Sequence, residues 1–362
     1  MFTTPEHHEF ADDAFDQPFL DIPYDVIAAI VQSLDFEGLK SLTPVSRNLY
    51  ELAGSRLWRF VIIDSSGRSN ICEAVEEVTR FISRPERAEH LRGVHAHMTE
   101  CRGRRSSDAT RQATRILTHA LTLAPKLSFL RVIAGSQDIP ILSDGLSRII
   151  LPSLREFETT LVGPELDQFW THHPAIRSLV ADSYSLVLSQ PIPLLNFLCV
   201  RNELQCRLIA GSPVTHIEIV RLTGEADSWE TLQPTLALST KPLEHLHIQS
   251  VPDTISAVHL YTLTVALLPQ LRHLHLNHRG AGFIRSAVAQ KQVLDALSSL
   301  QHLHTFEWLG PIPRPVHDAF FATCSEPCVL LRRVSITATD PDSGVGRIRK
   351  YTRKSVEHDW ES

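Results

Sequence analysis

Apolar residues recur at helical spacing within residues 19–62 of the chain. They step by four residues from Ile22 to Leu34, and by three or four from Leu39 to Leu52. Such spacing places apolar side chains on one face of a helix, so the pattern predicts two amphipathic helices. A segment this short buries too little surface to fold alone. We therefore expect these helices to dock against another surface.

A second pattern, with a longer period, fills most of the remaining chain. The motif apolar-x-x-apolar-x-apolar occurs ten times, at intervals of 19 to 36 residues. Its copies begin at Leu91, Leu127, Leu154, Ile176, Leu195, Val214, Leu243, Leu271, Leu303 and Leu331. Helical stretches such as 113–124, 255–268 and 288–300 lie between the copies. Each unit over residues 88–340 is thus predicted to run helix, turn, strand.

The two faces of the predicted strands differ in polarity. The fourth and sixth motif positions, such as Leu246 and Ile248, are apolar in every copy except at Thr159. The third and fifth positions, such as His245 and His247, are polar or charged in 15 of 20 cases. Because side chains alternate across a strand, one face is buried and the other meets water. This excludes a closed eight-stranded barrel, whose strands are buried on both faces, and favours an open α/β solenoid of parallel strands and outer helices.

Residues 19–62 resemble an F-box. The family pattern is Leu-Pro-x-Glu, an apolar helix, and Val-Cys-x-x-Trp. It maps onto Ile22-Pro23-Tyr24-Asp25, onto the apolar positions from Val26 to Leu34, and onto Val45-Ser46-Arg47-Asn48-Leu49. The chain departs from the pattern where Ile22, Asp25, Ser46 and Leu49 replace Leu, Glu, Cys and Trp.

Residues 88–340 resemble a degenerate leucine-rich repeat domain of the kind that follows the F-box in many F-box proteins. Most intervals between copies are within or near the range of about 20 to 29 residues typical of such repeats. The family's Asn or Cys, three places after the last apolar position, is absent here. We therefore expect irregular turns between strand and helix.

The two resemblances together imply a substrate-recognition adaptor of a cullin-RING ubiquitin ligase that has no catalytic activity of its own. The F-box would bind a Skp-family adaptor and, through it, cullin and RING subunits, while the solenoid recruits an unknown protein target. The residues expected to bind the adaptor are Ile22, Pro23, Val26, Ile30, Leu34, Leu39, Leu42 and Val45. The alternative is a non-ligase interaction scaffold, in which the F-box-like helices cap the solenoid.

Histidines supply the candidate chemistry. His245, His247, His273 and His275 hold equivalent motif positions, so adjacent parallel strands would bring their imidazoles together. We predict that the target binds this polar face through His216, Glu218, His245, His247, His273, His275 and Glu307. Unperturbed histidines titrate near pH 6.5, so affinity should change between about pH 6 and 7.5. A metal-dependent hydrolase built on this cluster is a third reading, but solvated histidines are favoured, and we predict no metal or other cofactor.

Composition narrows the function classes further. The chain has 35 Lys and Arg against 41 Asp and Glu, and this net charge of -6 argues against nucleic acid as a partner. It lacks any long apolar run or basic start, so neither a membrane span nor a secretory signal is expected, and the predicted location is cytoplasmic or nuclear. Six cysteines are too few for a disulfide framework. The sequence contains no phosphate-loop, dinucleotide, esterase or zinc-protease motif, so we predict no enzyme activity.

Three further segments complete the predicted organisation. Residues 1–18 mix acids, prolines and histidines, which predicts a flexible lead-in, and residues 63–87 are expected to form a connecting helical segment. Residues 341–362 are predicted to be a basic flexible tail, with nuclear import as a second interpretation. Cys324 and Cys328 lack the spacing of a zinc site, so we expect a loop there.

Overall fold

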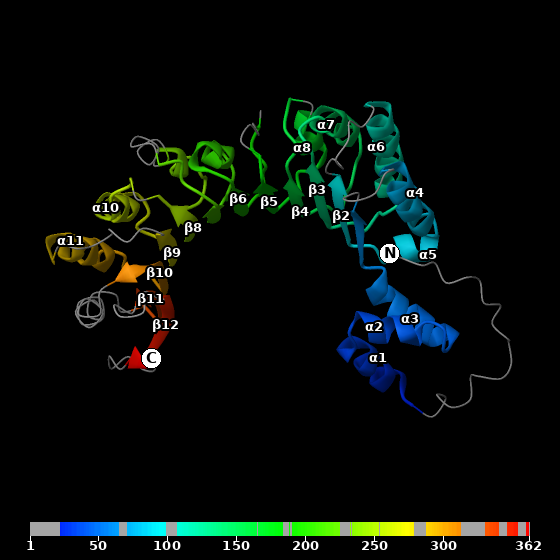
Figure 1. Ribbon diagram of the computed structural model, residues 1–362, viewed down its shortest axis with the longest axis horizontal. Helices are drawn as coiled ribbons and strands as arrows, with labels where there is room; N and C mark the ends of the chain where they lie inside the picture. Colours follow the sequence, from blue (N-terminus) through cyan, green and yellow to red (C-terminus); the bar gives the residue numbers. More distant parts are fainter. Residues whose placement is uncertain are drawn as a thin grey trace.

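The chain forms an arch whose inner side is lined by strands and whose outer side is covered by helices (Figure 1). This computed structural model describes residues 22–64, 71–98, 107–164, 166–183, 188, 190–224, 232, 234–252, 254–278, 287–312, 330–339, 346–353 and 360–361. The predicted lead-in at residues 1–18 and the expected loop at Cys324 and Cys328 lie outside the described residues.

Three short helices form the amino-terminal part of this fold, which we call the helical unit. They are α1 (Tyr24–Ser33), α2 (Phe36–Leu42) and α3 (Arg47–Leu57). The second apolar series of the sequence therefore covers two helices, not one. Pro44 lies in the turn between them, and its missing backbone N–H does not allow a helix to continue. The Ser46 hydroxyl then caps α3 by accepting a hydrogen bond of 3.2 Å from the N–H of Leu49.

The helical unit has a hydrophobic core of its own. Val31, Leu39, Leu49 and Ala53 are buried in it, and the partly buried Ile27, Leu34, Leu42, Leu52 and Leu57 pack around them. A second and much larger core runs from Val61 to Val334 through the rest of the chain. The two cores are separate, so the helical unit does not extend the solenoid core.

Within the described residues, eleven parallel strands follow one another in sequence order. They are β1 (Phe60–Asp64), β2 (Gly93–Met98), β3 (Phe129–Ala134), β4 (Glu156–Thr159), β5 (Ser178–Ala181), β6 (Phe197–Val200), β7 (His216–Ile219), β8 (His245–Val251), β9 (His273–His278), β10 (Thr305–Ile312) and β11 (Arg333–Thr339). Equivalent motif positions lie side by side, as where Leu246 pairs with Ile217 on one side and with Leu274 on the other. The predicted solenoid and its repeat register are confirmed.

Helices connect most of these strands on the outer side of the arch (Figure 1). They are α4 (Ile71–Ile82), α5 (Pro85–Ala88), α6 (Ser107–Thr122), α7 (Ile139–Ser147), α8 (Leu166–His172), the 3-10 helix η1 (Glu203–Ile209), α10 (Ala257–Leu267) and α11 (Ala287–Ser298). No helix in the described part of the chain has the length and apolar character needed to cross a membrane.

The strand face that turns toward the outer helices forms the solenoid core (Figure 1). Every residue at a fourth or sixth motif position whose side chain the structure describes is buried, and Leu246 is only 1% exposed. Thr159, the polar exception, is also buried, and its hydroxyl accepts a hydrogen bond of 2.9 Å from the N–H of Leu161. The hydroxyl thus satisfies a buried donor at the end of β4, which removes the cost of a polar group in the core.

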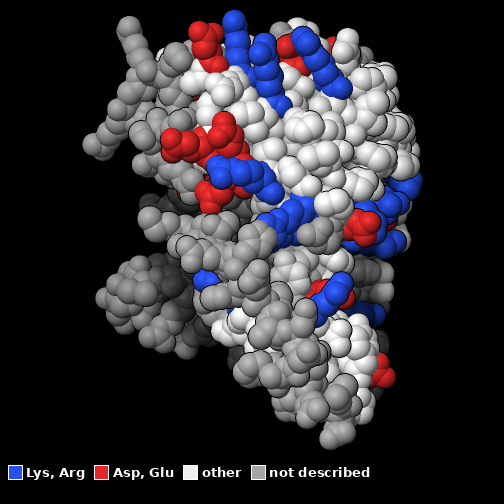
Figure 2. Space-filling model, turned by 90° about the vertical axis from the view of Figure 1, so that its right-hand side faces the viewer, with Lys and Arg blue, Asp and Glu red and all other residues white. Residues whose placement is uncertain are grey.

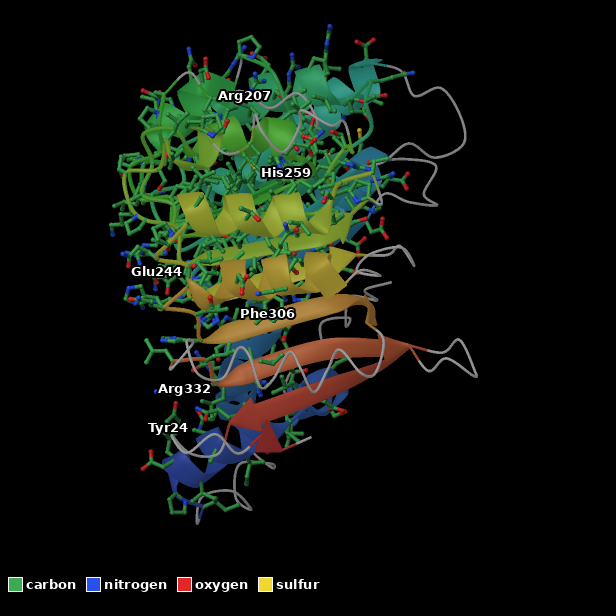
Figure 3. All side chains as sticks on the ribbon, turned by 90° about the vertical axis from the view of Figure 1, so that its left-hand side faces the viewer. Tyr24, Arg207, Glu244, His259, Phe306 and Arg332 are labelled. Atoms are coloured by element: carbon green, nitrogen blue, oxygen red, sulfur yellow. The ribbon has the colours of Figure 1, made fainter. Side chains whose placement is uncertain are left out.

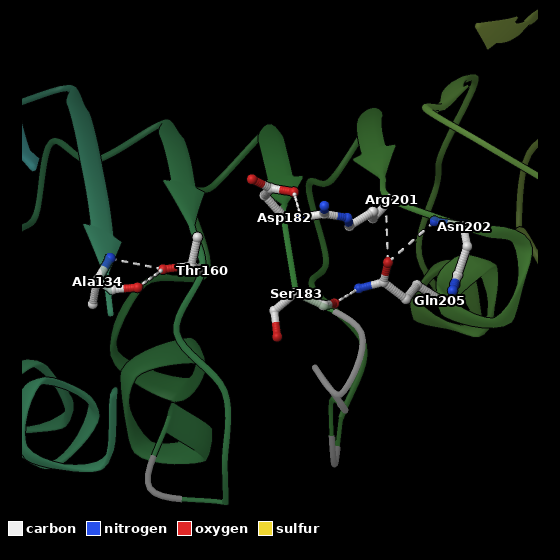
Figure 4. Close-up of polar contacts among 7 residues, drawn as sticks. All are labelled: Ala134, Thr160, Asp182, Ser183, Arg201, Asn202 and Gln205. Atoms are coloured by element: carbon white, nitrogen blue, oxygen red, sulfur yellow. Dashed lines mark hydrogen bonds and ion pairs between the residues drawn. The ribbon is translucent and has the colours of Figure 1, made fainter. Parts of the chain in front are cut away.

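Different side chains tie the strand ends in different repeats (Figure 4). The Thr160 hydroxyl accepts a hydrogen bond of 2.8 Å from the N–H of Ala134. Two repeats further on, the Gln205 carboxamide accepts from the N–H of Arg201 at 3.0 Å and donates to the carbonyl of Ser183. These two turns are stabilised by different side chains, in line with the irregular turns expected without a repeated Asn or Cys.

The sheet begins earlier than the sequence analysis predicts. β1 lies across the boundary between the predicted F-box and the connecting segment, and Val61 pairs with Val94 of β2. Trp58, Val61 and Ile63 repeat the apolar motif, which makes an eleventh copy. Assigning Trp58 to the F-box concealed this copy.

The predicted flexible tail is wrong for residues 346–353. They form β12 (Gly346–Arg353), which pairs antiparallel with β11 and then with β13 (Trp360–Glu361). Backbone pairing explains the difference, because an uncovered β11 would leave a row of unpaired N–H and C=O groups at the sheet edge. Arg347, Arg349, Lys350 and Arg353 therefore lie in a strand at the end of the sheet.

Candidate functional site

Helix α1 carries two apolar stripes, and only one faces the core of the helical unit. Ile27 and Val31 are one turn apart and pack inward. Val26 and Ile30 are one turn apart on another side of the helix, and each is 47% exposed. A helix that is apolar on an exposed side as well as on its core side offers a surface for a partner.

The predicted adaptor-binding residues divide between this exposed surface and the small core. Pro23, Val26, Ile30 and Val45 are exposed. Ile22, Leu34 and Leu42 are partly buried, and Leu39 is 4% exposed inside the core. Leu39 is therefore wrongly placed in the predicted surface, because periodicity alone does not show whether an apolar position faces the core or the solvent.

Tyr24 is an exposed residue that the sequence analysis did not select. Its side chain is 66% exposed at the start of α1. It lies at the variable position of the F-box-like motif, so the pattern drew no attention to it. Its aromatic ring, at the start of a predicted apolar helix, was the available signal, since aromatic residues are enriched at interfaces.

Trp58 joins the helical unit to the solenoid. Its ring is 7% exposed and lies 5.1 Å from the Tyr50 ring in an edge-on contact. On the solenoid side, the guanidinium of Arg87 lies 5.5 Å from the Trp58 ring centroid. Gly54 leaves room for this ring, because a Cβ built there would lie 2.4 Å from it. The joint is thus a compact aromatic contact between two separate cores.

Three histidines form a stacked row on the concave face, which we call the histidine ladder: His216, His245 and His273. They are neighbours in the register of β7, β8 and β9. The ring centroids are 3.6 Å apart between His216 and His245, and 4.0 Å apart between His245 and His273. Parallel strands about 4.8 Å apart bring the three rings side by side, and the rings lean together to within stacking distance.

A second row, which we call the acid–histidine row, runs beside the ladder: Glu218, His247, His275 and Glu307. His247 Nδ1 lies 3.3 Å from Glu218 Oε1, and His275 Nδ1 lies 2.6 Å from Glu307 Oε2. All seven predicted target-binding residues are therefore brought together. The sequence analysis missed Gln249, which donates to Glu218, and Ser335, whose hydroxyl lies 3.3 Å from Glu307 Oε1.

The three histidines of the ladder are mostly uncharged near neutral pH. Burial, together with the nearby His216, His273 and Arg272, lowers the pKa of His245 to about 4. Burial also lowers the pKa of His216 and His273 below the ordinary histidine value. The pH window predicted from unperturbed histidines therefore moves downward, below pH 6.5.

The acid–histidine row has a different electrostatic balance. Hydrogen bonding to His247 is the largest influence on Glu218 and lowers the pKa of its carboxyl. Burial lowers the pKa of His275, although Glu307 opposes this effect. The row thus presents carboxylate oxygens that are held by imidazole nitrogens of the neighbouring strands.

The cysteine and histidine side chains of the concave face are not arranged around a common centre. In the described part of the chain, no group of three or more His, Cys, Asp or Glu side chains is placed to hold a metal ion. The ladder rings stack face to face, which directs each ring plane at its neighbour. Cys199 lies near this face, and burial raises the pKa of its thiol to about 12.

Fold and site define an open, leucine-rich-repeat-like α/β solenoid with a helical unit at one end. No protein-family model and no curated protein sequence matches the chain. Among solved structures, one match is the leucine-rich repeat-containing protein LegL7 from Legionella pneumophila. The TM-score is 0.39 and the identity 12%, over 80% of this chain and 92% of LegL7.

Proposed function

We propose that this chain is a non-catalytic adaptor that brings two proteins together. The helical unit docks to a Skp-family adaptor of a cullin-RING ubiquitin ligase. The concave face of the solenoid binds a protein target for ubiquitin transfer. This function combines a small helical docking surface with a large polar sheet face.

The separation of the two cores is the observation that carries the proposal. A helical cap would bury its apolar residues against the end of the solenoid and extend the larger core. Instead, the helical unit packs around Val31 and Leu39 and leaves Val26 and Ile30 exposed. Such an exposed apolar stripe on a packed helix supports docking to a separate protein.

The alternative scaffold function draws on the contact at Trp58. This ring meets Arg87 of the solenoid, so the helical unit is not merely tethered. A scaffold outside any ligase would use this contact for stability and would bind no Skp-family protein. The two functions therefore differ in what the exposed stripe of α1 does.

A binding measurement with two matched double variants tests the docking. Val26→Ser with Ile30→Ser removes the exposed stripe, and Leu204→Ser with Leu238→Ser removes two apolar residues of similar exposure, 59% and 51%, from the solenoid. Fully burying an aliphatic side chain is worth about 1.5 to 3 kcal/mol, so burying two half-exposed ones should change affinity about tenfold or more. We expect the purified full chain to bind a recombinant Skp-family adaptor, and only the α1 variant to lose affinity.

Two results of this measurement would argue for the scaffold. One is that the wild-type chain does not bind the adaptor. The other is that the α1 variant binds normally but unfolds at a lower temperature, which would show that the stripe stabilises the chain.

The concave face is proposed as the target-binding surface. The ladder and the acid–histidine row are partly buried polar side chains on the water-facing side of the strands, where core packing does not require them. They offer hydrogen-bond donors and acceptors in a fixed spacing. Replacing His245, His247, His273 and His275 by Ser should abolish target recruitment and leave adaptor binding intact.

A further inference from the structure

A row of arginines follows the amino edge of the sheet in the first five repeats. The residue that precedes the strand is Arg59 before β1, Arg92 before β2, Arg155 before β4 and Arg177 before β5. Ser128 holds the same place before β3. Four of five equivalent positions are therefore arginine in a chain whose net charge is -6.

Backbone hydrogen bonds fix the spacing of this row. The N–H of Gly93 donates to the carbonyl of Arg59 at 3.0 Å, and the N–H of Ser128 donates to the carbonyl of Arg92 at 2.8 Å. The N–H of Arg177 donates to the carbonyl of Arg155 at 2.7 Å. Neighbouring positions therefore lie about one strand spacing apart, near 4.8 Å.

The charges of this row are not matched by carboxylates. Arg59, Arg155 and Arg177 are exposed, and Arg92 is partly buried with Nη1 donating to the carbonyl of Glu89 at 2.7 Å. Among the residues that the structure describes, none of the four forms an ion pair with Asp or Glu. Arg131, which lies within β3, differs from these four because its Nε forms an ion pair with Glu158 Oε1 at 3.0 Å.

An exposed apolar patch lies next to Arg59. Phe60 and Ile62 of β1 are 55% and 58% exposed. The Phe60 ring lies 6.2 Å from the ring of Phe129, and it lies over Gly93, where a Cβ would come within 2.2 Å of it. We call the four arginines together with Phe60, Ile62 and Phe129 the amino-edge surface.

The figures place this edge on the outside of the molecule. Glu244 and Arg332, which precede β8 and border β11, are labelled on the left of Figure 3, so the amino edge of the sheet lies there. The same edge lies on the right of the opposite view, where basic side chains and some acidic ones lie at mid-height (Figure 2). Tyr24 of the helical unit is on the same side of the molecule in Figure 3.

We propose that the amino-edge surface binds an extended acidic segment of a partner protein, in which carboxylates alternate with aromatic residues. A guanidinium forms paired hydrogen bonds with a carboxylate, and Arg155 and Arg177 are adjacent and exposed for this purpose. The ring of Phe60 offers an aromatic contact beside them. Nucleic acid fits this edge less well, because Glu156 lies next to Arg155 and the whole chain is acidic.

The surface includes neither α1 nor the two histidine rows, so the proposal stands apart from the proposed ligase function. The sequence itself shows what such a ligand looks like. Residues 6–19 of this chain contain five carboxylates and three phenylalanines. Occupation by this segment is the competing outcome that the experiment must separate from a partner.

The test is fluorescence anisotropy with the full chain and a labelled peptide of four Asp-Asp-Phe repeats. We expect binding that weakens as salt is raised, because the contacts are exposed. Arg155→Gln with Arg177→Gln should weaken binding about tenfold. Arg115→Gln with Arg207→Gln, which removes two exposed arginines from the outer helices, should leave it unchanged. Phe60→Ser should also weaken binding without changing the charge.

Four results would overturn the proposal. They are equal binding of an Asn-Asn-Phe peptide, equal loss in the outer-helix control, tighter binding of an oligouridylate, and an affinity that rises about tenfold when Asp12, Asp13 and Asp16 are changed to Asn. The third result would assign the surface to nucleic acid, and the fourth would assign it to the chain's own residues 6–19.

Discussion

A histidine on the concave face of this solenoid has its neighbours fixed by the strand register. His245 lies between His216 and His273. A positive charge on one ring repels a positive charge on the next. Burial and these neighbours lower the pKa of His245 to about 4. The sequence correctly predicts which histidines meet, because equivalent motif positions pair. It could not predict how far burial would lower their pKa, which depends on the packing around each ring.

The lowered pKa values predict how stability depends on pH. In the pH range between about 4 and 6.5, an unfolded His245 binds a proton that the folded one does not, so stability must fall as pH falls through that range. Changing His216, His245 and His273 to Gln should flatten this loss in a urea-unfolding series measured at several pH values. His119→Gln, at an exposed position of α6, is the control and should keep the wild-type profile. An unchanged profile in the triple variant would contradict the assignment.

A single core residue tests which face of the strands is buried. Leu246 is 1% exposed between Ile217 and Leu274, so Leu246→Asp buries a charge in the core and should cost several kcal/mol, about 3 or more. The repeats should then unfold at a much lower temperature in a circular-dichroism melt. Leu204→Asp, at a 59% exposed position, should melt like the wild type. A normal melt for Leu246→Asp would disprove the assigned face.

Among the elements, α3 packs closely against the ring of Trp58, the residue that follows it. Gly54 lies inside α3, where alanine normally stabilises a helix by about 1 kcal/mol. Here a Cβ would lie 2.4 Å from the Trp58 ring, so Gly54→Ala should destabilise the chain. In a Trp58→Leu background the same change should cost little, and a double-mutant cycle on unfolding free energies measures the difference. Equal costs in both backgrounds would show that the two side chains do not interact.

The elements also show what sequence periodicity can and cannot predict. It predicted the parallel repeats because a strand shows its buried face in every second residue, as at Leu246 and Ile248. It missed β1 because Trp58 fits both the end of the helical segment and the start of a repeat. It could not separate the exposed Ile30 from the buried Leu39, since both lie in apolar stripes.

The whole molecule is an arch with two hydrophobic cores, one in the solenoid and one in the helical unit. Each of these two parts exposes a different kind of surface. The solenoid holds its polar strand face on the concave side, and the helical unit holds an exposed apolar stripe at one end (Figure 1). This division suits a protein that holds two partners at once. Binding at the helical unit should therefore leave the strands of the solenoid undisturbed.

Hydrogen exchange on the full chain, with and without a Skp-family adaptor, tests this account most directly. The adaptor should slow exchange in peptides that cover α1 and the turn at Val45, because docking buries the stripe of Val26 and Ile30. Peptides from β7 to β10 should exchange at the same rate with and without the adaptor. Absence of protection at α1, or protection centred on the strands, would contradict the account.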